Sequence, residues 1–591
     1  MKVGESYDVI IVGSGGAGLC SAISAAENGL KVLIMSKGRV NRSGATQLAG
    51  SGLGGDIEAD GESLWNLGYK DADRTHTRET WFKNLILQGS FLNDQGLTEN
   101  YVNTSGEIIK NMLDWGMKPY FLLEGVALFV AGTHILDILY RRARELGAEA
   151  IGNRIVTDIV TYKNHVAGVV SIDVYTGEMF YNSAKAVIIA TGGCQGLYSL
   201  NSGTAELTCD GISMALRAGA EIQDMEMIEF CNDTIVHPRK YKGNILPYVL
   251  RLFGYGELLN KDGECFLERY FSSDIIDIAL HTEWNKELVS YAEYMEIKKG
   301  KGVNGGVIFT MENSPESEFK SIYGMFPMIN HAPMDVEIMK RLENGERLYV
   351  APASHYIPGG IRVNSNYETN INGLYAAGEC KAGTFGANRV SSALTEMLVE
   401  GYLAGKKAGQ YAKGRELLEV PRDYLEKYEE EVLKPFGTSH ESKFKSFVEL
   451  RKKLQETMWE YVGPVKNEKD LLLASNIVDE LSKELLKIKI KDSSREYNPE
   501  WIEYLNLRNM ILASKAIVKS SLIRKESRGV HIREDYFFVD NKNWLKHIVI
   551  YDTSLNYRFE NVIITKLQPK PVKMPYLDYI RTLLKEVKGA Y

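Results

Sequence analysis

A glycine cluster close to the N-terminus has the spacing of a phosphate-binding turn. It consists of Gly13, Ser14, Gly15, Gly16, Ala17 and Gly18. In a GxGxxG pattern the first glycine permits a tight turn, the second lets the backbone approach a pyrophosphate, and the third allows a helix to pack closely on a strand. The pyrophosphate then lies at the N-terminus of the following helix, where backbone N–H groups favour an anion.

The residues around this turn predict the strand, helix and second strand that such a site requires. Residues 9–12 (VIIV) are typical of a buried parallel strand, residues 17–26 (AGLCSAISAA) of a tightly packed helix, and residues 31–36 (KVLIMS) of a second strand. A bare glycine pattern is a weak signal, and an accidental turn is the alternative, but this context favours a nucleotide site. The second strand ends in Ser36-Lys37, where an NAD site usually carries an acid for the ribose. This weakens the case for NAD and leaves FAD open.

Composition narrows the class of protein further. A chain of 591 residues with 25% charged and 44% hydrophobic residues predicts a soluble protein of about three to four domains. We expect no membrane span, no signal peptide and a cytoplasmic location, because no apolar run is long enough and the first strand begins almost at once. The net charge of −7, without a long basic run, argues against nucleic acid as a partner.

The cysteines argue against a metal site on this chain. There are six of them, scattered and without a CxxC pair, so we expect no bound zinc and no iron–sulfur cluster. Scattered cysteines also fit a reducing compartment. Any cluster that takes part in the chemistry would therefore belong to a partner.

Two segments far along the chain show features of the same nucleotide-binding fold. Residues 185–193 (KAVIIATGG) predict a buried strand that ends in small residues, and residues 373–379 (GLYAAGE) repeat this pattern. Glu379 could accept a hydrogen bond from a ribose hydroxyl. Either strand alone could equally be ordinary α/β core, but together with the glycine turn they favour a flavin-binding fold.

At this point the chain resembles a known family, the flavoprotein subunits of succinate dehydrogenase and fumarate reductase, with L-aspartate oxidase and the adenylylsulfate reductase flavoprotein as cousins. The resemblance covers nearly the whole chain. Its matching pieces, in the family's order, are the glycine turn, RSGAT (42–46), ATGG (190–193), TCDG (208–211), PASHYIPGGI (352–361), GLYAAGE (373–379), GANR (386–389) and RKESRGVHIRED (524–535). The set is specific for the fold and less specific for the substrate, because the cousins share most of it.

The resemblance implies an α/β architecture. It predicts a Rossmann-like FAD-binding domain in two segments, an inserted α+β capping domain, a C-terminal helical domain and a small β tail. The expected boundaries are 1–225 and 351–405 for the FAD-binding domain, 226–350 for the cap, 406–535 for the helical domain and 536–591 for the tail. Within the tail, residues 548–553 (IVIYDT) and 560–567 (ENVIITKL) predict a short hairpin.

The cofactor that the resemblance implies is FAD. Besides the glycine turn, the residues expected to hold it are Ser36, Lys37, Ser43, Gly44, Ala45, Thr46, Gly50, Val156, Ala190, Thr191, Gly192, Asp210, Tyr356, Gly378, Glu379, Arg389, Ala393 and Leu394. Succinate dehydrogenase and fumarate reductase carry a histidine that bonds covalently to FAD where this chain reads RSGAT (42–46). We therefore expect the FAD to be noncovalent.

Two residues match the positions that bind substrate in this family, whose chemistry is two-electron transfer between flavin N5 and a small dicarboxylate held under the cap. His355 lies in HYIPGG, and Arg389 in GANR could clamp a carboxylate with two hydrogen bonds. Taken alone, each could be structural, as a buried histidine or as half of an ion pair. The motif context favours a function for both.

Other substrate positions depart from the family. Dicarboxylate enzymes read roughly MEFxQxHP where this chain reads MEMIEFCN (225–232), so Cys231 replaces the second substrate histidine. The His237-Pro238 pair that follows is either a shifted ligand or an ordinary turn, and we prefer the turn. Arg251, in an altered RGEGG-like segment, could still reach the pocket.

The arginine that delivers a proton in the dicarboxylate enzymes is also missing from its expected place. After Glu268-Arg269-Tyr270 the family continues to an SRD-type stretch, and this chain reads ALHTE (279–283) instead. His281 could act as the general acid, since a histidine pKa lies near 6.5. A surface histidine is the alternative.

These features predict an FAD-dependent oxidoreductase of the fumarate reductase type that acts on an organic acid or related acceptor other than fumarate, with electrons exchanged through an iron–sulfur partner. The alternatives are a noncatalytic flavin protein that relays electrons within a larger complex, or an enzyme like adenylylsulfate reductase or aspartate oxidase. Residues 527–535 and 543–547 match flavoproteins that dock an iron–sulfur subunit, in complexes that can be membrane-associated. These residues could equally pack the helical domain against the FAD-binding domain.

Overall fold

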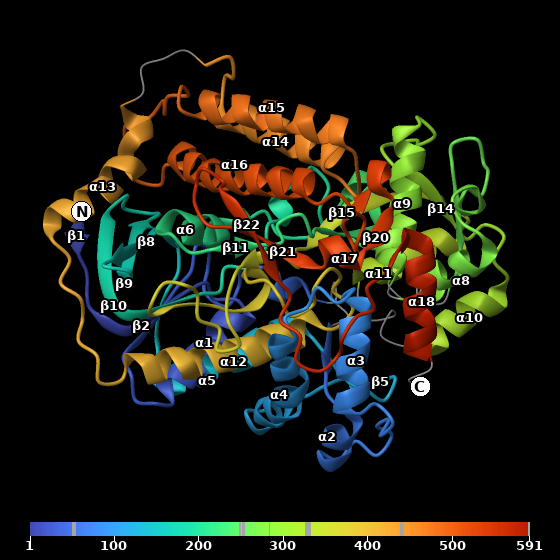
Figure 1. Ribbon diagram of the computed structural model, residues 1–591, viewed down its shortest axis with the longest axis horizontal. Coiled ribbons are helices and arrows are strands. Elements are labelled where there is room, and N and C mark those ends of the chain that lie inside the picture. The colour runs from blue at the N-terminus through green and yellow to red at the C-terminus, as the bar shows by residue number, and fades with distance from the viewer. Residues whose placement is uncertain are drawn as a thin grey trace.

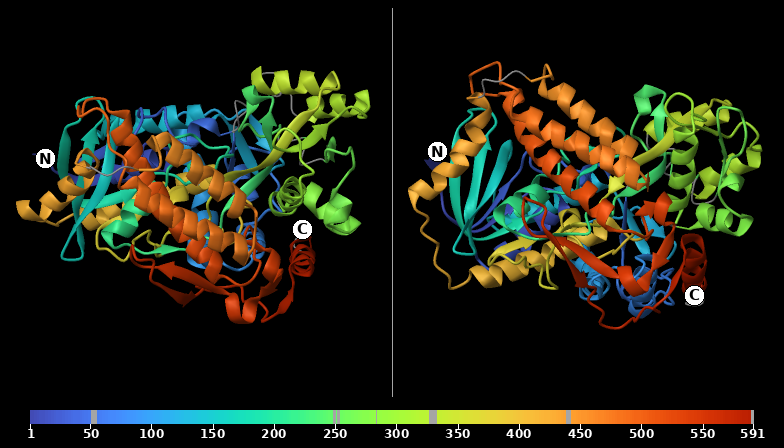
Figure 2. Two further views of the ribbon diagram at one scale, coloured as in Figure 1. Left: turned by 90° about the horizontal axis from the view of Figure 1, so that it is seen from above. Right: turned by 45° about the horizontal axis from the view of Figure 1, so that its top comes forward.

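The computed structural model of the chain describes residues 1–49, 55–247, 250, 254–282, 284–325, 333–437 and 442–588. In Figure 1 a large sheet with its helices lies on the left, a stack of helices runs along the top, and a smaller sheet with helices lies on the right. The two further views in Figure 2 keep this smaller unit to one side of the molecule. The fold is α/β, as predicted.

The large sheet is built around the N-terminal strand. Strand order is β7-β3-β2-β10-β9-β8, and β1 and β17 also pair with β10. Strands β7, β3, β2, β10 and β17 run parallel, whereas β9 and β8 are antiparallel to β10 and to each other. The bounds are β1 (Lys2–Val3), β2 (Tyr7–Val12), β3 (Val32–Met35), β7 (Glu149–Ile151), β8 (Arg154–Tyr162), β9 (His165–Asp173), β10 (Met179–Ile189) and β17 (Leu374–Ala376). The predicted strands at 9–12, 31–36 and 185–193 are confirmed, with slightly different ends.

Two helices that are distant in sequence pack against each other beside this sheet. They are α1 (Gly16–Ala26), which follows the glycine turn as predicted, and α12 (Ala393–Ala412). A Cβ atom on Gly401 would clash with the carbonyl oxygen of Ala17, and one on Gly405 would clash with that of Ser21. The glycines of α12 therefore allow the two backbones to approach closely, and they fix the start of α1 relative to the segment that precedes α12.

The smaller unit on the right of Figure 1 contains an antiparallel sheet in the order β12-β15-β14-β13. Its elements are β12 (Glu229–His237), β13 (Glu257–Leu259), β14 (Val307–Thr310), β15 (Leu348–Tyr356), α8 (Ser273–His281), α9 (Asn285–Lys298), α10 (Glu316–Met325) and α11 (Pro333–Glu343). Strand β15 crosses the boundary expected at residue 350. It therefore carries His355 as its penultimate residue.

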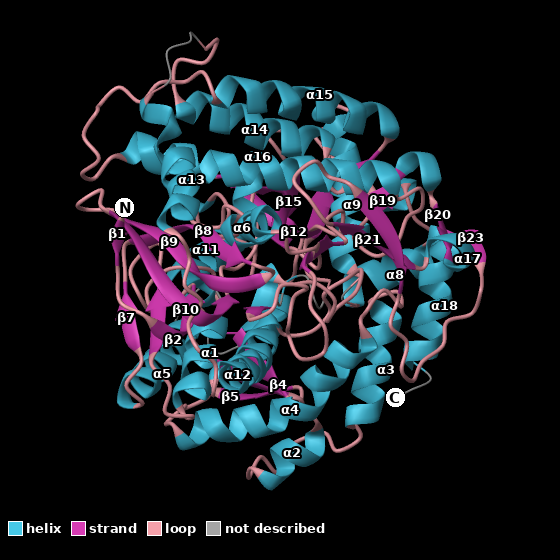
Figure 3. Cartoon of the chain, turned by 60° about the vertical axis from the view of Figure 1, so that its left-hand side comes forward, coloured by secondary structure: helices cyan, strands magenta, loops and turns pink. Residues whose placement is uncertain are grey.

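The C-terminal third is mainly helical. Helices α14, α15 and α16 stack above the sheets in Figure 3. The bounds are α13 (Arg422–Leu433), α14 (Phe447–Tyr461), α15 (Glu468–Leu485) and α16 (Pro499–Ile523). A tail hairpin forms as predicted, from β21 (Lys546–Ile550) and β22 (Tyr557–Asn561), but most of the second strand predicted at 560–567 lies outside it. The hairpin continues a sheet with β11 (Ile222–Gln223) and β16 (Gly360–Ile361). The tail thus shares a sheet with segments from two earlier parts of the chain.

The other helices and strands are mostly short and lie around these units. They are β4 (Gly55–Glu58), β5 (Phe121–Leu123), β6 (Ala127–Val130), β18 (Val465–Lys466), β19 (Ile532–Arg533), β20 (Phe538–Asp540), β23 (Lys573–Pro575), α2 (Gly61–Asn66), α3 (Arg78–Gln88), α4 (Gln95–Asp114), α5 (Gly132–Glu145), α6 (Asp210–Ala218), α17 (Asn541–Trp544) and α18 (Tyr576–Lys588).

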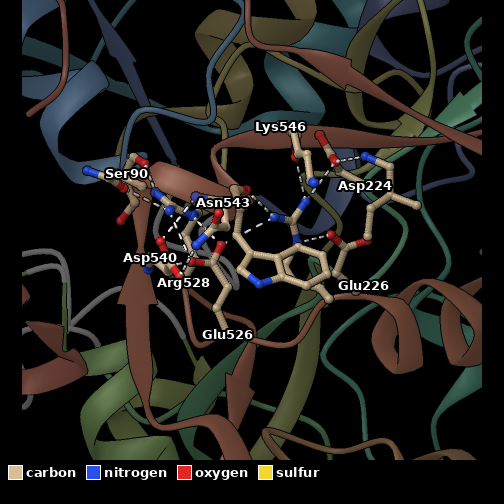
Figure 4. Close-up of polar contacts among 12 residues, drawn as sticks. Ser90, Asp224, Glu226, Glu526, Arg528, Asp540, Asn543 and Lys546 are labelled. Atoms are coloured by element: carbon tan, nitrogen blue, oxygen red, sulfur yellow. Dashed lines mark hydrogen bonds and ion pairs between the residues drawn. The ribbon is translucent and has the colours of Figure 1, made fainter. Parts of the chain in front are cut away.

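A buried network of ion pairs fastens the C-terminal segment to the turn before β12. The Arg524 guanidinium pairs with Glu226 and lies 3.3 Å from both Asp224 and Glu526. Arg528 pairs with Glu526 at 2.7 Å, and both arginine side chains are fully buried. Figure 4 shows these carboxylates converging on the arginines from two separate parts of the chain. Since removing one partner leaves the others charged and buried, the network is a strong constraint on the fold.

The same segment braces the loop that carries Arg389. Arg528 donates a hydrogen bond to the carbonyl oxygen of Ser90 at 2.7 Å, and the backbone N–H of Val530 donates to that of Ala387 at 2.9 Å. Gly529 has φ +50°, and a Cβ atom there would clash with the Ala387 carbonyl group. The GANR loop is therefore held from behind by residues about 140 positions later in the chain.

We predict that Arg524→Met lowers the free energy of unfolding by about 3–5 kcal/mol, because three buried carboxylates lose their shared counter-charge. Denaturant unfolding followed by circular dichroism measures this loss. The matched control is Arg74→Met, which removes an ion pair with Glu62 whose side chains are 56% and 55% exposed, and should cost less than about 1 kcal/mol. Equal losses in the two variants would contradict the structural importance of the network.

Candidate functional site

One cavity collects the predicted cofactor positions. Those that line it are Gly13, Ser14, Gly15, Gly16, Ala17, Ser36, Lys37, Ser43, Gly44, Ala45, Thr46, Val156, Ala190, Thr191, Gly192, Asp210, Tyr356, Gly378, Glu379, Arg389, Ala393 and Leu394, together with His355. Gly18 is not in the lining, because it packs against the carbonyl group of Gly13 within the turn. Gly50 lies outside the described residues.

The glycine turn leaves the N-terminus of α1 open toward this cavity. Gly13 has φ +115°, and a Cβ atom there would clash with the carbonyl oxygen of Ala190. Gly15 precedes the helix without a side chain that could cap it, and the first turn of α1 carries no acidic residue. The backbone N–H of Gly16 donates to the Thr46 hydroxyl at 3.2 Å. The N–H groups at the start of a helix, at the positive end of its dipole, form a site for an anion.

A half-buried ion pair lies in the cavity wall at the end of the second strand. Lys37 Nζ is 2.8 Å from Asp210 Oδ2, and it also donates to the hydroxyl of Thr208. Burial alone would raise the pKa of Asp210, but the positive charge of Lys37 and the hydrogen bonds from Lys37, Asn509 and Thr208 together outweigh this effect and lower the pKa. Asp210 is therefore ionised and keeps Lys37 in place.

Strand β15 and the GANR loop bring the two predicted substrate residues into the same wall. The ring of His355 shares a hydrogen bond with the Ser202 hydroxyl, with 2.7 Å between Nδ1 and Oγ. The guanidinium carbon of Arg389 lies 5.1 Å from the centroid of the Tyr356 ring. Tyr356 in turn donates to Glu396 at 2.6 Å. Both His355 and Arg389 thus line the cavity.

Arg389 also takes part in a buried cluster with Glu229 and Lys286, called here the Arg389 cluster. Arg389 Nη2 lies 2.9 Å from Glu229 Oε1, and Lys286 Nζ lies 3.8 Å from the same oxygen. Lys286 also donates to the backbone carbonyl oxygen of Arg389 at 3.2 Å. Burial opposes ionisation of Glu229, yet the charges of Arg389 and Lys286 lower its pKa. The cluster thus sets a carboxylate directly against two cations.

Comparison with known proteins assigns the chain to a family. The family described as "FAD binding domain" matches residues 8–126 and 123–394, and "Fumarate reductase flavoprotein C-term" matches residues 451–576. The chain belongs to the fumarate reductase and succinate dehydrogenase flavoprotein family. It is an FAD-dependent oxidoreductase of this type.

Individual relatives match along almost the whole chain. An uncharacterized FAD-dependent oxidoreductase of Methanocaldococcus jannaschii is 30% identical, over 92% of this chain and 96% of the relative. A CoM/CoB fumarate reductase subunit of Methanothermobacter marburgensis is 28% identical, over 90% and 94%. The structure of a mutant E. coli quinol fumarate reductase chain superimposes with a TM-score of 0.81 at 25% identity, over 96% and 99%.

The cavity of this flavoprotein fits FAD. The open N-terminus of α1 suits the pyrophosphate, and the glycines around it leave space that side chains would fill. Two buried polar atoms in the wall, Thr191 Oγ1 and Gln195 Oε1, have no hydrogen-bond partner among the described residues. Buried polar atoms are normally paired, so these atoms are suited to contact a bound ligand.

Lys286 and Glu229 are site residues that the sequence analysis did not identify. The sequence analysis matches ALHTE (279–283) to the family's SRD-type segment. In the structure α8 ends at His281, and α9 begins only at Asn285. The basic–acidic pair Lys286-Glu287, in the first turn of α9, is the one that reaches the cluster. A search a few residues further along the sequence, for a basic residue followed by an acidic one, would have found Lys286-Glu287.

His281 does not join the Arg389 cluster. It is the last residue of α8, its side chain is 51% exposed, and its Nδ1 lies 3.2 Å from the carboxylate of Asp277 one turn earlier. His281 therefore lies at the surface and not in the cavity lining, in agreement with the alternative to a role as general acid. His237 is likewise exposed, at the end of β12 and before a 3₁₀ turn, in agreement with the preferred turn.

Cys231 lies on β12 next to the cluster and is buried. Burial raises the pKa of its thiol to about 12, so it is protonated at neutral pH. The predicted residue Arg251 lies outside the described residues. None of the six cysteines forms a disulfide, and the described part of the chain contains no group of three or more His, Cys, Asp or Glu residues that could hold a metal ion.

Within the described ranges, no helix combines the length and the apolar character needed to cross a bilayer.

Glu379 is a half-buried acid of the cavity wall whose ionisation should affect stability. Its Oε1 accepts hydrogen bonds from Gln195 and from the backbone N–H of Ile357, but burial dominates and raises its pKa from 4.5 to about 7. Between these values the folded apoprotein holds a proton that the unfolded chain releases. The free energy of unfolding should therefore fall as the pH rises from about 4.5 to 7.

We predict that Glu379→Gln removes this part of the pH dependence, which should amount to about 1–3 kcal/mol. The measurement is denaturant unfolding of the flavin-free protein at pH 5 and pH 7.5, for the wild type and for the variant. If the two proteins lose the same stability over this range, Glu379 is not the group responsible.

Proposed function

We propose that this flavoprotein transfers two electrons between FAD and a small organic acid or related acceptor other than fumarate, and exchanges them with an iron–sulfur partner. The observation that supports this proposal is that His355 and Arg389 line the same cavity as the glycine turn. Groups suited to bind a carboxylate thus adjoin the site that fits the cofactor. FAD, when bound, supplies the two-electron chemistry.

Each residue of the wall has a proposed role. Arg389 binds a substrate carboxylate through charge-assisted hydrogen bonds, and its contact with Tyr356 keeps the guanidinium in position. His355 orients the substrate, with its own ring held by Ser202. Lys286 holds a proton at Nζ beside the Arg389 cluster, and it takes the role of proton donor that the resemblance assigns to an arginine.

Two features argue against fumarate as the substrate. Glu229 places a negative charge against Arg389 and Lys286, so the cluster attracts a dianion less than two free cations would. Cys231, a protonated thiol, occupies the place of a second substrate histidine. A less anionic compound than fumarate would fit these surroundings better.

The partner is proposed from two observations. Relatives such as the CoM/CoB fumarate reductase protein carry the name of a subunit, and the cysteines of this chain are scattered. Purification from the source organism with mass spectrometry and iron analysis of the associated chains tests this part. A flavoprotein that exchanges electrons with such a partner but reacts with no organic acid would instead be an electron-relay subunit.

We predict that the FAD is noncovalent, because residues 42–46 contain no histidine and most of them line the cavity. Acid precipitation of the pure holoprotein should then leave the yellow flavin in the supernatant, where its absorbance is measured. Flavin that stays with the precipitated protein after tryptic digestion would show a covalent bond.

The proposed reaction is tested by rapid mixing of the dithionite-reduced holoprotein with a panel of organic acids, while flavin reoxidation is followed at about 450 nm, where oxidised flavin absorbs. We predict that at least one acid reoxidises the flavin and that fumarate does so no faster than buffer. Lys286→Met should lower the rate at which the reactive compound reoxidises the flavin by roughly 100-fold, which is the usual contribution of a general acid. Lys286→Arg should retain more of this rate. Family-typical turnover of fumarate would contradict the proposal.

A further inference from the structure

Two carboxyl groups on helix α12 share one lysine behind the cavity wall. Glu396 and Glu400 lie one helical turn apart, and Lys381 Nζ lies 2.7 Å from Glu400 Oε1 and 3.6 Å from Glu396 Oε1. The three side chains are no more than 2% exposed. Like charges four residues apart on a helix repel each other, and burial strengthens this repulsion. The arrangement therefore favours a state in which one of the two carboxyl groups holds a proton.

The hydrogen bonds indicate which of the two acids holds this proton. Besides the shared lysine, Glu400 accepts from the Thr384 hydroxyl at 2.6 Å and from the backbone N–H of Gly378 at 3.0 Å. Glu396 accepts from the Tyr356 hydroxyl, at 2.6 Å from Oε2. Since donors stabilise a carboxylate, the negative charge belongs on Glu400. Burial, followed by the charge of Glu400, raises the pKa of Glu396 from 4.5 to about 8.

The titratable groups around Glu396 are mostly acids. They are Tyr356 on β15, Glu379 and Lys381 in the segment 378–381, Glu400 on α12, Tyr367 before β17 and Asp94 before α4. Strand β4 adds Glu58, whose carboxylate is bound by Ser391 and Tyr101. Lys381 is the cation of this set, and a neutral Glu396 relieves the excess of negative charge.

The carboxyl group of Glu396 has a hydrogen to donate, and Glu396 lines the cavity. Burial and the nearby carboxyl groups raise the pKa of Tyr356 well above its usual value, so its hydroxyl stays protonated and occupies Oε2 as a donor. A proton on Oε1 faces Lys381, whose ammonium group donates and cannot accept. The described residues thus provide no acceptor for this O–H group, and a ligand in the cavity can supply one.

The neighbours of Glu396 indicate which part of FAD this ligand group belongs to. On one side, Tyr356 carries the Arg389 guanidinium at 5.1 Å from its ring centroid. On the other, the next residue, Met397, packs at the start of α1, where a Cβ atom on Gly16 would clash with its sulfur. Glu396 therefore lies between the helix N-terminus that suits the pyrophosphate and the arginine proposed to bind the substrate. The flavin ring, with its carbonyl oxygens and ring nitrogens as acceptors, is the part of FAD that must bridge these two places.

We propose that Glu396 is protonated at neutral pH and donates a hydrogen bond from its carboxyl group to the flavin ring, so that FAD binding weakens when this proton is lost. An ionised Glu396 would lack the donor and would turn a buried negative charge toward acceptor atoms. This inference rests on the proposed function only in placing the substrate beside Arg389. It makes Glu396 a cofactor-binding residue whose ionisation links FAD affinity to pH.

The test measures the dissociation constant of FAD at pH 7.5 and pH 9.5. The holoprotein is diluted in steps, and the free FAD in an ultrafiltrate is measured by its fluorescence. We expect the dissociation constant of the wild type to rise at least about fivefold over this range, because the protonated fraction of Glu396 falls with pH. Glu379 has a pKa of about 7, so most of its ionisation precedes this range.

Two variants separate the donor from the charge. Glu396→Gln keeps an N–H donor and cannot ionise, so its dissociation constant should rise less than about twofold between the two pH values. Glu396→Leu has no donor and should bind FAD about tenfold more weakly than Glu396→Gln at pH 7.5, which is the usual effect of one lost hydrogen bond. The matched control is Glu484→Gln, which neutralises a carboxylate paired with Lys487 on α15 and should show the wild-type pH dependence. The unfolding midpoint shows whether each variant is folded, and the wild-type measurement stands without any variant.

The outcomes separate this inference from the proposed function. A wild-type affinity that does not change with pH, or the same change in Glu396→Gln, would overturn the role of Glu396 while the proposed reaction with an organic acid stands. Equal affinities of the glutamine and leucine variants at pH 7.5 would also overturn it. A wild-type protein that retains no FAD at pH 7.5 would overturn both.

Discussion

The pairing of Arg524 with three buried carboxylates is the constraint on which the geometry of the site depends. Asp224 and Glu226 precede β12, whereas Glu526 belongs to the C-terminal segment, so one guanidinium joins parts of the chain about 300 residues apart. Asp224 extends the connection to the tail hairpin, because it contacts the ring of His547 at 2.5 Å and accepts from the backbone N–H of Ile548. Buried charges tolerate little displacement, since each partner left unpaired carries a large desolvation penalty. The start of β12, and with it Glu229, is therefore held in one position.

The second determinant is the register between β12 and β15. Side chains alternate along a strand, so a slip by one residue would move Glu229 or His355 to the opposite face of the cap sheet. Glu229 lies opposite Tyr356 in this register, close to the point where Arg524 anchors the start of β12. Helix α9 packs against the same strand, and Ser290 donates a hydrogen bond to the carbonyl oxygen of Phe230. This explains how Lys286, on a helix, and Glu229, on a strand, come to share a partner in Arg389. The Arg389 cluster is thus assembled from strand β12, helix α9 and the GANR loop.

The parts of the fold that depend on local sequence could be predicted, whereas those that depend on distant packing could not. The glycine turn, α1 and the buried strands follow from steric needs and apolar runs that are visible within a few residues. Lys286 was missed because the spacing between the end of α8 and the start of α9 decides which residue reaches the Arg389 cluster, and no local pattern specifies that spacing. Glu229 gave no signal, since an acid on a strand is recognised as a site residue only when its cationic partners are known. The hairpin at 546–561 was predictable as a hairpin, but its pairing with β11 was not, because that pairing joins segments more than 300 residues apart.

The Arg389 cluster shows how a buried wall can hold two cations side by side. Arg389 and Lys286 without a carboxylate would repel each other and leave their buried charges poorly compensated. Glu229 offsets this repulsion, since its Oε1 lies 2.9 Å from Arg389 Nη2 and 3.8 Å from Lys286 Nζ. The same ion pair, together with the Tyr356 ring 5.1 Å from the guanidinium carbon, holds Arg389 in one orientation. A side chain that is already ordered in this way loses little entropy in a further contact, so the cluster gives up positive charge and gains pre-organisation.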